Sequence, residues 1–521
     1  MNIALLCTDS DLWAFGTRLI SSVLKRAGHS TRLILLASDS PEYSAQVLEE
    51  AGELVRQSDL VGISCYSRGS RKARQVAASL GAHRKTTIWG GLHASLNPAE
   101  CAEAAGIVCR GEGEETILEL VEALEDGRAW EGIRNLAFRQ REGVVLNPLR
   151  PPIASLDDLP LLDFERSNEF HLSHGHLTKA PSDPRLAHSP RMQYIGSRGC
   201  ALHCTYCCNR KVKEMYSGNG KYLRRMSPAR YVEHLAALRR DHFPEATDVF
   251  LLDEDFFLRG VEEIREFADL YRRHVGLPFD CMVSPPRIAD EKMRLLVEAG
   301  LWRISLGVES GSERTKKEVF DRPIPNETVV RASRTIKRYP GVAPCYFFII
   351  GNPYEDRQDL LDTLSLMTRM DYPYYTNIYN LVFFPGSELF DRAVRDGIIA
   401  GTQDSGFELH FRAGLKYRDH AWKQNNLYLN GLLFLTEGKA TKRRLGLLPR
   451  GMIPFLTRPG VIDFMDRRKT VCQVVISSKV LLLRARARLG GVLKRLMKNP
   501  ADAYNLPRYL KRKLARVVYQ P

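Results

Sequence analysis

Apolar runs alternate with amphipathic stretches along the first 130 residues. The runs are short and rich in branched and aromatic residues, and the segments between them repeat apolar residues at helical spacing. Buried strands that alternate with helices are typical of a parallel, doubly wound sheet. We therefore expect a Rossmann-like α/β domain over residues 1–135, with strands at Asn2–Cys7, Arg32–Ala37, Leu60–Cys65, Thr86–Trp89 and Ile107–Cys109.

A second series of the same kind begins at Gln193 and runs to about Phe390. Six strand-and-helix units predict a partial, TIM-like (β/α)6 barrel over residues 193–400 rather than a closed eight-fold one. Residues 136–192 are rich in Pro, Asp and Ser and predict a linker, whereas residues 401–521 predict a mostly helical region. The barrel strands are expected at Gln193–Ser197, Asp248–Leu252, Phe279–Val283, Arg303–Gly307, Cys345–Ile350 and Asn377–Val382.

Four of the eleven cysteines fall within nine residues just after the first barrel strand. Thiolates at Cys200, Cys204 and Cys207 can surround one corner of a cuboidal 4Fe-4S cluster and leave one iron open to a substrate. A zinc site usually joins two separated pairs of ligands, and the sequence has no second Cys-x-x-Cys pair. We predict a cluster on these three cysteines, with Cys208 outside the ligand set.

The cysteine spacing, with an aromatic residue before the last cysteine, resembles the signature of radical S-adenosylmethionine (AdoMet) enzymes. The resemblance extends over the whole second series and implies that AdoMet binds the open iron and is cleaved to a 5'-deoxyadenosyl radical. It also implies AdoMet contacts for Tyr206, Asp253, Glu254, Glu309 and Gly351. For Asp253 and Glu254, an acidic surface loop after a strand is the competing interpretation, and the sequence singles out no catalytic residue.

Polar and glycine-rich segments follow the strands of the first series, where ligands of such sheets bind. Gly90-Gly91-x-His93 and the later Gly111-Glu112-Gly113-Glu114 resemble, in this order, the cobalamin-binding domain found in front of many radical AdoMet enzymes. The resemblance implies cobalamin contacts for Asp11, Trp13, Ser64, Gly90, Gly91, His93, Gly111 and Glu112.

The slot of the classical cobalt-binding histidine departs from that pattern, because Trp13 stands there. Indole is no cobalt ligand, so either the lower face of the corrin lacks a protein ligand or Trp13 is simply a packing aromatic. Both interpretations stay open at this point. We expect His93 to be a turn or corrin-contact residue rather than a metal ligand.

The basic charge belongs to the end of the chain. Residues 441–521 hold 20 Lys and Arg against 3 Asp, or +17, so the first 440 residues sum to about −2 of the net +15. A basic amphipathic pattern at Lys479–Lys498 suits a helical cap, an anionic membrane surface or, less well, nucleic acid. The sequence shows neither a signal peptide nor a spanning segment, which predicts a cytoplasmic protein with a potential membrane contact.

The two resemblances together imply a cobalamin-dependent radical AdoMet methyltransferase that methylates an unactivated carbon by way of the radical and methylcobalamin. A cyclase or rearrangement enzyme with the same domains is the alternative. A tRNA methylthiotransferase would need a second cluster on Cys7, Cys65 and Cys101 or Cys109, and a non-catalytic iron-sulfur module is the remaining class. We expect a small or lipid-like substrate and an electron donor such as flavodoxin or ferredoxin.

Overall fold

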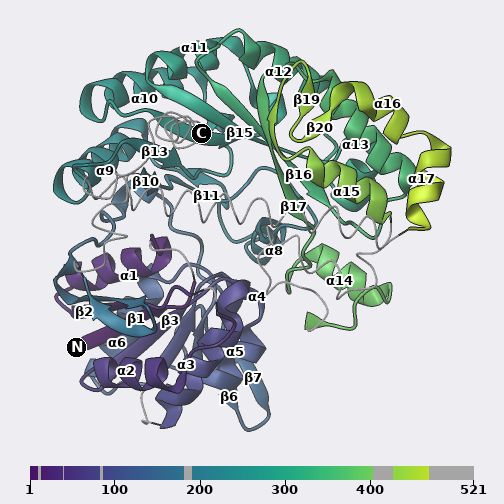
Figure 1. Cartoon of the computed structure of the whole chain (residues 1–521). Helices are drawn as coiled ribbons and strands as arrows, with labels where there is room; N and C mark the ends of the chain where they lie inside the picture. Colours follow the sequence, from purple (N-terminus) through teal and green to yellow (C-terminus); the bar gives the residue numbers. More distant parts are fainter. Residues whose placement is uncertain (10–12, 39, 83–85, 181–190, 403–425, 469–521) are drawn as a thin grey trace, which may run out of the picture.

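The computed structural model describes residues 1–521 except 10–12, 39, 83–85, 181–190, 403–425 and 469–521. Two large sheets organise it (Figure 1). The first domain lies beneath the open side of a strongly curved second sheet, and helix α8 (Cys208–Met215) lies between them. The predicted α/β class, with a Rossmann-like first domain and a partial barrel, is confirmed.

The first sheet has the strand order β7-β6-β5-β4-β3-β1-β2-β8-β9, with a parallel centre and antiparallel edges. Helices cover both faces, because its strands are apolar on both sides. Its strands are β1 (Asn2–Cys7), β2 (Ser30–Leu35), β3 (Leu60–Ser64), β4 (Thr87–Gly90), β5 (Gly106–Cys109), β6 (Leu136–Gln140), β7 (Gly143–Leu146), β8 (Glu169–Ser173) and β9 (His176–Lys179). Its helices are α1 (Phe15–Arg26), α2 (Ala45–Val55), α3 (Ser70–Ala82), α4 (Leu92–Leu96), α5 (Pro98–Ala105) and α6 (Glu114–Glu125).

Residues 136–192 differ from the expected linker. They supply β6 to β9, so both edges of the first sheet come from this segment. The pattern of hydrophobic positions did not reveal these strands, because strands at the edge of a sheet bury only one side. The proline-rich stretches between them also lack a regular repeat of apolar residues. Strand β8 is bound firmly: Glu169 is fully buried and pairs with Arg18 of α1 at 2.8 Å.

The second sheet has six parallel strands in the order β10-β13-β14-β15-β16-β17, which confirms the partial barrel. The strands are β10 (Arg191–Tyr194), β13 (Asp248–Leu251), β14 (Phe279–Val283), β15 (Leu301–Glu309), β16 (Ala343–Ile350) and β17 (Tyr374–Asn380). The helices on its convex side are α9 (Pro228–Asp241), α10 (Val261–His274), α11 (Asp290–Glu298), α12 (Asn326–Lys337) and α13 (Arg357–Arg369), and α14 (Glu388–Arg395) follows β17. A small ladder of β11 (Ser197–Arg198) and β12 (Arg224–Arg225) flanks the cysteine loop.

The described part of the C-terminal region is not only helical. Strands β18 (Gly438–Ala440), β19 (Arg444–Leu445) and β20 (Leu448–Pro449) extend the barrel sheet antiparallel to β17. Helices α15 (Leu427–Leu435), α16 (Ile453–Leu456) and α17 (Pro459–Asp466) pack beside them. The basic pattern at Lys479–Lys498 lies outside the described residues, and no described helix is long and apolar enough to cross a membrane.

Glu169→Gln tests whether β8 is an integral strand. Burial raises the pKa of Glu169, but hydrogen bonds from His171 and Arg18 outweigh it and lower the value to about 2. The ion pair therefore contributes stability at neutral pH, which is lost as the pH falls from the ordinary range of a carboxyl toward 2. We expect the variant to lose about 3–5 kcal/mol at pH 7, measured by denaturant unfolding. The control Glu165→Gln, at an exposed carboxyl of the same segment, should change little.

Candidate active site

The cysteine loop connects β11 to α8 and is fixed by backbone contacts on both sides. Thr205 N–H donates to the Phe320 carbonyl at 3.1 Å, and Leu389 N–H donates to the Thr205 carbonyl at 2.9 Å. Gly199 has φ +90°, and a Cβ there would lie 2.8 Å from the Tyr222 carbonyl, so only glycine suits this entry to the loop. The backbone of the loop is thus anchored on both sides, at Thr205 and at Gly199.

The three predicted ligands differ in burial: Cys204 is buried, whereas Cys200 and Cys207 are half-buried. Burial raises the pKa of Cys200 to about 12, and the neighbouring Cys207 and Cys204 sulfurs add to the rise. Burial raises the pKa of Cys204 as well, so both thiols stay protonated until a metal stabilises the thiolates. The described residues contain no set of three His, Cys, Asp or Glu side chains placed for a single metal ion.

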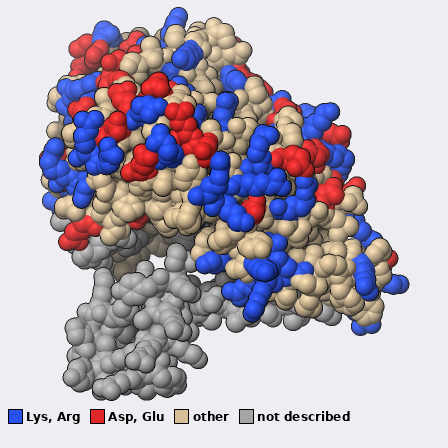
Figure 2. Space-filling view, turned by 90° about the horizontal axis from the view of Figure 1, so that it is seen from above, with Lys and Arg blue, Asp and Glu red and all other residues tan. Residues whose placement is uncertain are grey.

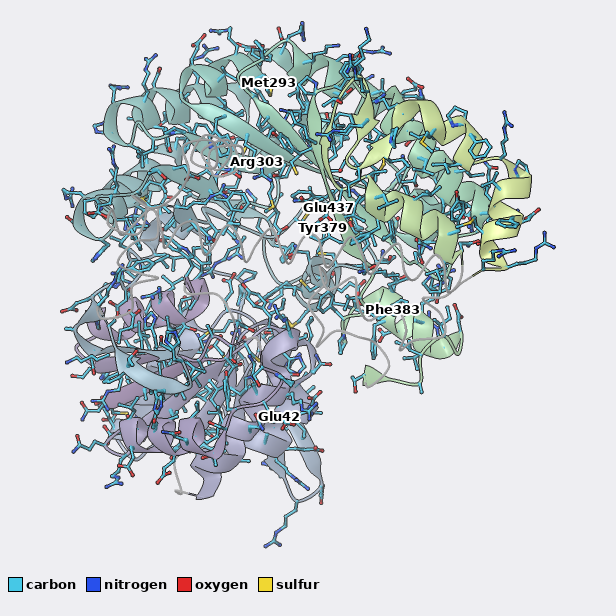
Figure 3. The ribbon with its side chains drawn as sticks, in the orientation of Figure 1. Glu42, Met293, Arg303, Tyr379, Phe383 and Glu437 are labelled. Atoms are coloured by element: carbon cyan, nitrogen blue, oxygen red, sulfur yellow. The ribbon has the colours of Figure 1, made fainter. Side chains whose placement is uncertain are left out.

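The residues expected to contact AdoMet lie around this loop at the carboxyl ends of the barrel strands. Tyr206 packs edge-on against Phe320, with ring centroids 5.0 Å apart, and shares a hydrogen bond with Glu309 at the end of β15. Burial raises the pKa of Glu309, and Arg322 opposes that rise. Gly351 has φ +70° and donates its N–H to Asn430 of α15 at 2.9 Å. Figure 3 shows Arg303 of β15 and Tyr379 of β17 on the concave side of this sheet.

The two acidic residues after β13 have different surroundings. Asp253 is fully buried, and its carboxylate accepts from Arg259 at 3.0 Å and from the Tyr231 hydroxyl at 2.5 Å. Glu254 instead lines the cavity between the domains, where burial raises its pKa and a hydrogen bond with Asn209 opposes the rise. Only Glu254 is placed to meet a ligand, so the expected AdoMet contact of Asp253 is not supported by this geometry.

A cavity of about 400 Å³ joins the two domains. From the first domain it is lined by the strand ends at Ser64, Gly91 and Gly111. From the second it is lined by Glu254, by helix α8 from Cys208 on, and by Gly199 at the entry to the cysteine loop. A second, mostly apolar cavity of about 260 Å³ extends from the same strand ends down between the sheet and helices α1 and α6. Ser64, Gly90, Gly91, Gly111 and Glu112 all line it. The two cavities share the lining residues Ser64, Gly91, Gly111 and Glu112. This arrangement suits a flat ring system over the strand ends with an appended base in the deeper, 260 Å³ cavity, which we call the slot.

Trp13 and His93 lie elsewhere, and Asp11 lies outside the described residues. Trp13 is buried in an aromatic cluster, stacked on Phe243 of the second domain at 4.9 Å. This corresponds to the packing interpretation rather than to a place under the cobalt. His93 is 1% exposed; its Nδ1 lies 3.2 Å from the Ser67 hydroxyl, and its Nε2 lies 3.6 Å from Glu100. His93 therefore holds the turn and does not meet the cavity.

The Gly111-Glu112 segment contacts the second domain, which the sequence did not indicate. Glu112 accepts from Arg224 at 3.0 Å and from Arg198 at 3.1 Å, and its own N–H donates to the Tyr216 hydroxyl at 2.9 Å. A Cβ on Gly111 would lie 2.1 Å from that hydroxyl. Burial raises the pKa of Glu112, but the two arginines outweigh it and keep the pKa below its ordinary value. This loop therefore docks the first domain beside helix α8, which follows the cysteine loop.

Two family models match the chain, in the order of the two domains. The B12-binding domain matches residues 1–121, and the radical SAM superfamily matches residues 194–367. The chain is a radical AdoMet enzyme with a B12-binding domain. B12-binding domains bind cobalamin, and radical SAM domains bind a 4Fe-4S cluster and AdoMet. Cobalamin, the cluster and AdoMet are therefore the cofactors of this enzyme. The two cavities and the cysteine loop described above fit these three cofactors.

Two relatives and one solved structure are similar to this chain over most of its length. It is 25% identical to the cytidylyl-2-hydroxyethylphosphonate methyltransferase of Streptomyces wedmorensis, over 77% of this chain and 82% of that protein. It is 26% identical to the anaerobic magnesium-protoporphyrin IX monomethyl ester cyclase of Rubrivivax gelatinosus, over 71% and 64%. The radical AdoMet methyltransferase TsrM of Kitasatospora setae, solved with its tryptophan substrate and an AdoMet analogue, shares the fold with a TM-score of 0.61, at 17% identity over 76% of each chain.

We expect Cys200→Ala to remove the cluster from the reconstituted enzyme. Alanine offers a methyl group where the third thiolate was, and two thiolates are too few to hold the cluster. The iron content and the broad visible absorbance of the cluster should both fall to near zero. Cys208→Ala is the matched control, since Cys208 lies next to Cys207 but outside the predicted set. Loss of the cluster in the Cys208 variant, with retention in the Cys200 variant, would contradict the ligand assignment.

Glu112→Gln tests the docking loop. Replacing one partner of charged hydrogen bonds should weaken the domain contact by about 1.5–3 kcal/mol. We expect faster amide hydrogen exchange in residues 111–114 and in α8 at neutral pH. The difference from the wild type should shrink in acid, once the pH falls below the lowered pKa of Glu112 and the wild-type carboxylate becomes protonated. Glu115→Gln, which removes an exposed carboxylate on α6 beside Arg150, is the control. Exchange that speeds up equally in both variants would show that Glu112 has no special part in docking.

Proposed function

We propose that this enzyme methylates an unactivated carbon of a small-molecule substrate. The single observation that carries the proposal is the shared cavity, in which the corrin-binding strand ends of the first domain face Glu254 and the two flanks of the cysteine loop, Gly199 and Cys208. One substrate held there would be within reach of both cofactors. The similarity to a phosphonate methyltransferase over most of both chains supports methyl transfer over other outcomes.

When bound, AdoMet on the cluster supplies the 5'-deoxyadenosyl radical, and cobalamin supplies the methyl group. The residues of this chain would hold the parts in place. We assign Cys200, Cys204 and Cys207 to the cluster. We assign Glu254 to the ammonium group of AdoMet, Glu309 to its ribose and the Tyr206 and Gly351 segments to its adenine, because ionised acceptors suit an ammonium and a diol.

Ser64, Gly90, Gly91 and Gly111 are assigned to cobalamin, since these residues line the slot and leave room for a bulky ligand close to the backbone. Gly91 illustrates the requirement, because it has φ +91° and a Cβ there would meet the Ser64 hydroxyl at 2.9 Å.

A cyclase or rearrangement enzyme is the second candidate, because a cyclase is among the similar proteins over most of this chain. A methylthiotransferase has less support. Cys65 and Cys101 are almost fully buried among apolar side chains on one face of the first sheet, and Cys109 is buried on the other. Cys7 and Cys65 do line the cavity between the domains, but the match of residues 1–121 to the B12-binding domain favours a corrinoid over a second cluster there.

Labelled AdoMet separates the first two candidates. The anaerobic, reconstituted enzyme would be incubated with a one-electron reductant, AdoMet labelled on its methyl group, and a small-molecule extract of cells that lack the protein. We expect a labelled product, with S-adenosylhomocysteine and 5'-deoxyadenosine formed in comparable amounts. A changed but unlabelled product accompanied by 5'-deoxyadenosine would instead establish the cyclase class. Cys200→Ala should yield neither 5'-deoxyadenosine nor product.

We propose two further partners. One is an electron donor of the flavodoxin or ferredoxin kind. The other is an anionic membrane surface, which the following observations support. Large exposed apolar side chains gather near the end of the described chain, at Leu447, Met452, Phe455 and Phe464. Arg458 stacks over Phe455 at 5.6 Å, and Arg468 stacks over Phe464 at 4.4 Å. Lys and Arg also gather on the side of the barrel that carries α16 and α17 (Figure 2). Apolar side chains set among cations are typical of surfaces that bind anionic bilayers.

Flotation with lipid vesicles tests the membrane contact. The full chain should float with phosphatidylglycerol vesicles and much less with phosphatidylcholine vesicles, and it should do so less at high salt. The double variant Phe455→Ser, Phe464→Ser should reduce flotation several-fold. Leu146→Ser removes an equally exposed apolar side chain from the far edge of the first sheet and is the matched control. A wild-type chain that floats with neither vesicle would rule the contact out.

A further inference from the structure

The three predicted cluster ligands lie in unequal electrostatic surroundings. Arg322 directs its Nη1 toward the Cys204 sulfur at 3.6 Å. On the other side of the loop, Glu254 lines the same cavity as Gly199 and Cys208, the sequence neighbours of Cys200 and Cys207. A cation therefore lies on one side of the cysteine loop and a carboxylate on the other.

The position of Arg322 is set by the backbone as well as by its own contacts. Its guanidinium also donates from Nη2 to the Gly307 carbonyl at 2.9 Å, and the residue is only 6% exposed. The turn before it is joined to the cysteine loop, because Thr205 donates its N–H to the Phe320 carbonyl. Arg322 is thus held beside Cys204 by its direct contact with the sulfur and by the backbone hydrogen bond between Thr205 and Phe320.

Glu254 is placed with similar precision. It follows β13, shares a hydrogen bond with Asn209 at the start of α8, and lines the cavity between the domains. Asp253 beside it is already paired with Arg259, so its charge is largely compensated. Glu254 is therefore the acidic group that acts on Cys200 and Cys207 from this loop.

Charge and hydrogen bonds at the sulfurs are the means by which a protein adjusts the reduction potential of an iron-sulfur cluster. Reduction adds one electron, so a nearby cation favours the reduced form and a nearby carboxylate disfavours it. Salt screens the effect of Arg322 weakly, because that residue is buried, whereas Glu254 is exposed on the cavity wall and its effect is screened more.

We propose that Arg322 and Glu254 are positioning residues that set the reduction potential of the cluster from opposite sides. Arg322 raises the potential through its hydrogen bond to Cys204, and Glu254 lowers it through its charge beside Cys200 and Cys207. The step concerned is the transfer of one electron from an external donor, which is oxidised, to the cluster, which is reduced. The inference rests on the cluster assigned under the proposed function, and it is independent of methyl transfer.

A redox titration of the reconstituted full chain without AdoMet tests this, with the electron paramagnetic resonance signal of the reduced cluster as the readout. At the wild-type midpoint, Arg322→Gln should lower the ratio of reduced to oxidised cluster about tenfold, a shift of about 59 mV for one electron. Glu254→Gln should change the ratio in the opposite direction, and Arg322→Lys should fall between wild type and Arg322→Gln. Arg314→Gln, at a partly exposed arginine of the same turn that pairs with Asp359, is the control and should not shift the midpoint.

Wild-type midpoints in both Arg322→Gln and Glu254→Gln would overturn the proposal. So would an Arg322→Gln variant that keeps its potential but loses affinity for AdoMet, because Arg322 would then serve the ligand and not the cluster. If Arg322→Gln binds no cluster, Arg322→Lys and Glu254→Gln decide: shifts in opposite directions support the proposal, and unshifted values overturn it. The labelled-AdoMet experiment can fail without altering any of these midpoints, so the two proposals fail separately.

Discussion

The contact of Glu112 with Arg224 and Arg198 determines how the rest of this molecule can work. Two cofactors bound by different domains must act on one substrate, and neither domain alone defines the separation between them. The carboxylate reaches across to arginines on β11 and β12, the ladder that flanks the cysteine loop. Because partners on both sides are largely buried, the pairing resists screening by salt. The cysteine loop and the corrin-binding strand ends are therefore positioned by the same few side chains.

Tyr216 adds a second constraint on that distance. Its hydroxyl accepts the Glu112 N–H and occupies the space that a Cβ on Gly111 would need. Tyr216 directly follows α8, so a shift of the cysteine loop and α8 would also move the Tyr216 hydroxyl that contacts Glu112. The geometry between the domains thus depends on backbone shape and on one glycine as much as on charge.

The sequence predicted the central strands well, because strands buried on both faces leave continuous apolar runs. It also located the ends of those strands, where the ligand-binding segments lie. It could not show which way a side chain at a strand end faces, and Asp253 and His93 accordingly turned out to be enclosed by partners distant in sequence. The edge strands of the first sheet and the arginine beside Cys204 left no local signal, because each depends on a contact formed only in the folded chain.

The aromatic cluster around Trp13 has a consequence for how such enzymes diversify. Trp13 and Phe164 come from the part of the chain that builds the first domain, and Phe243 comes from the barrel; all three belong to one continuous hydrophobic core. The two domains are therefore not separate modules joined by a tether, since each supplies part of the other's interior. A first domain transplanted from a related enzyme would have to bring matching aromatic residues with it or leave a void in the barrel that receives it. Exchange of whole domains between such enzymes is thus constrained by the packing of aromatic side chains that bind neither cofactor.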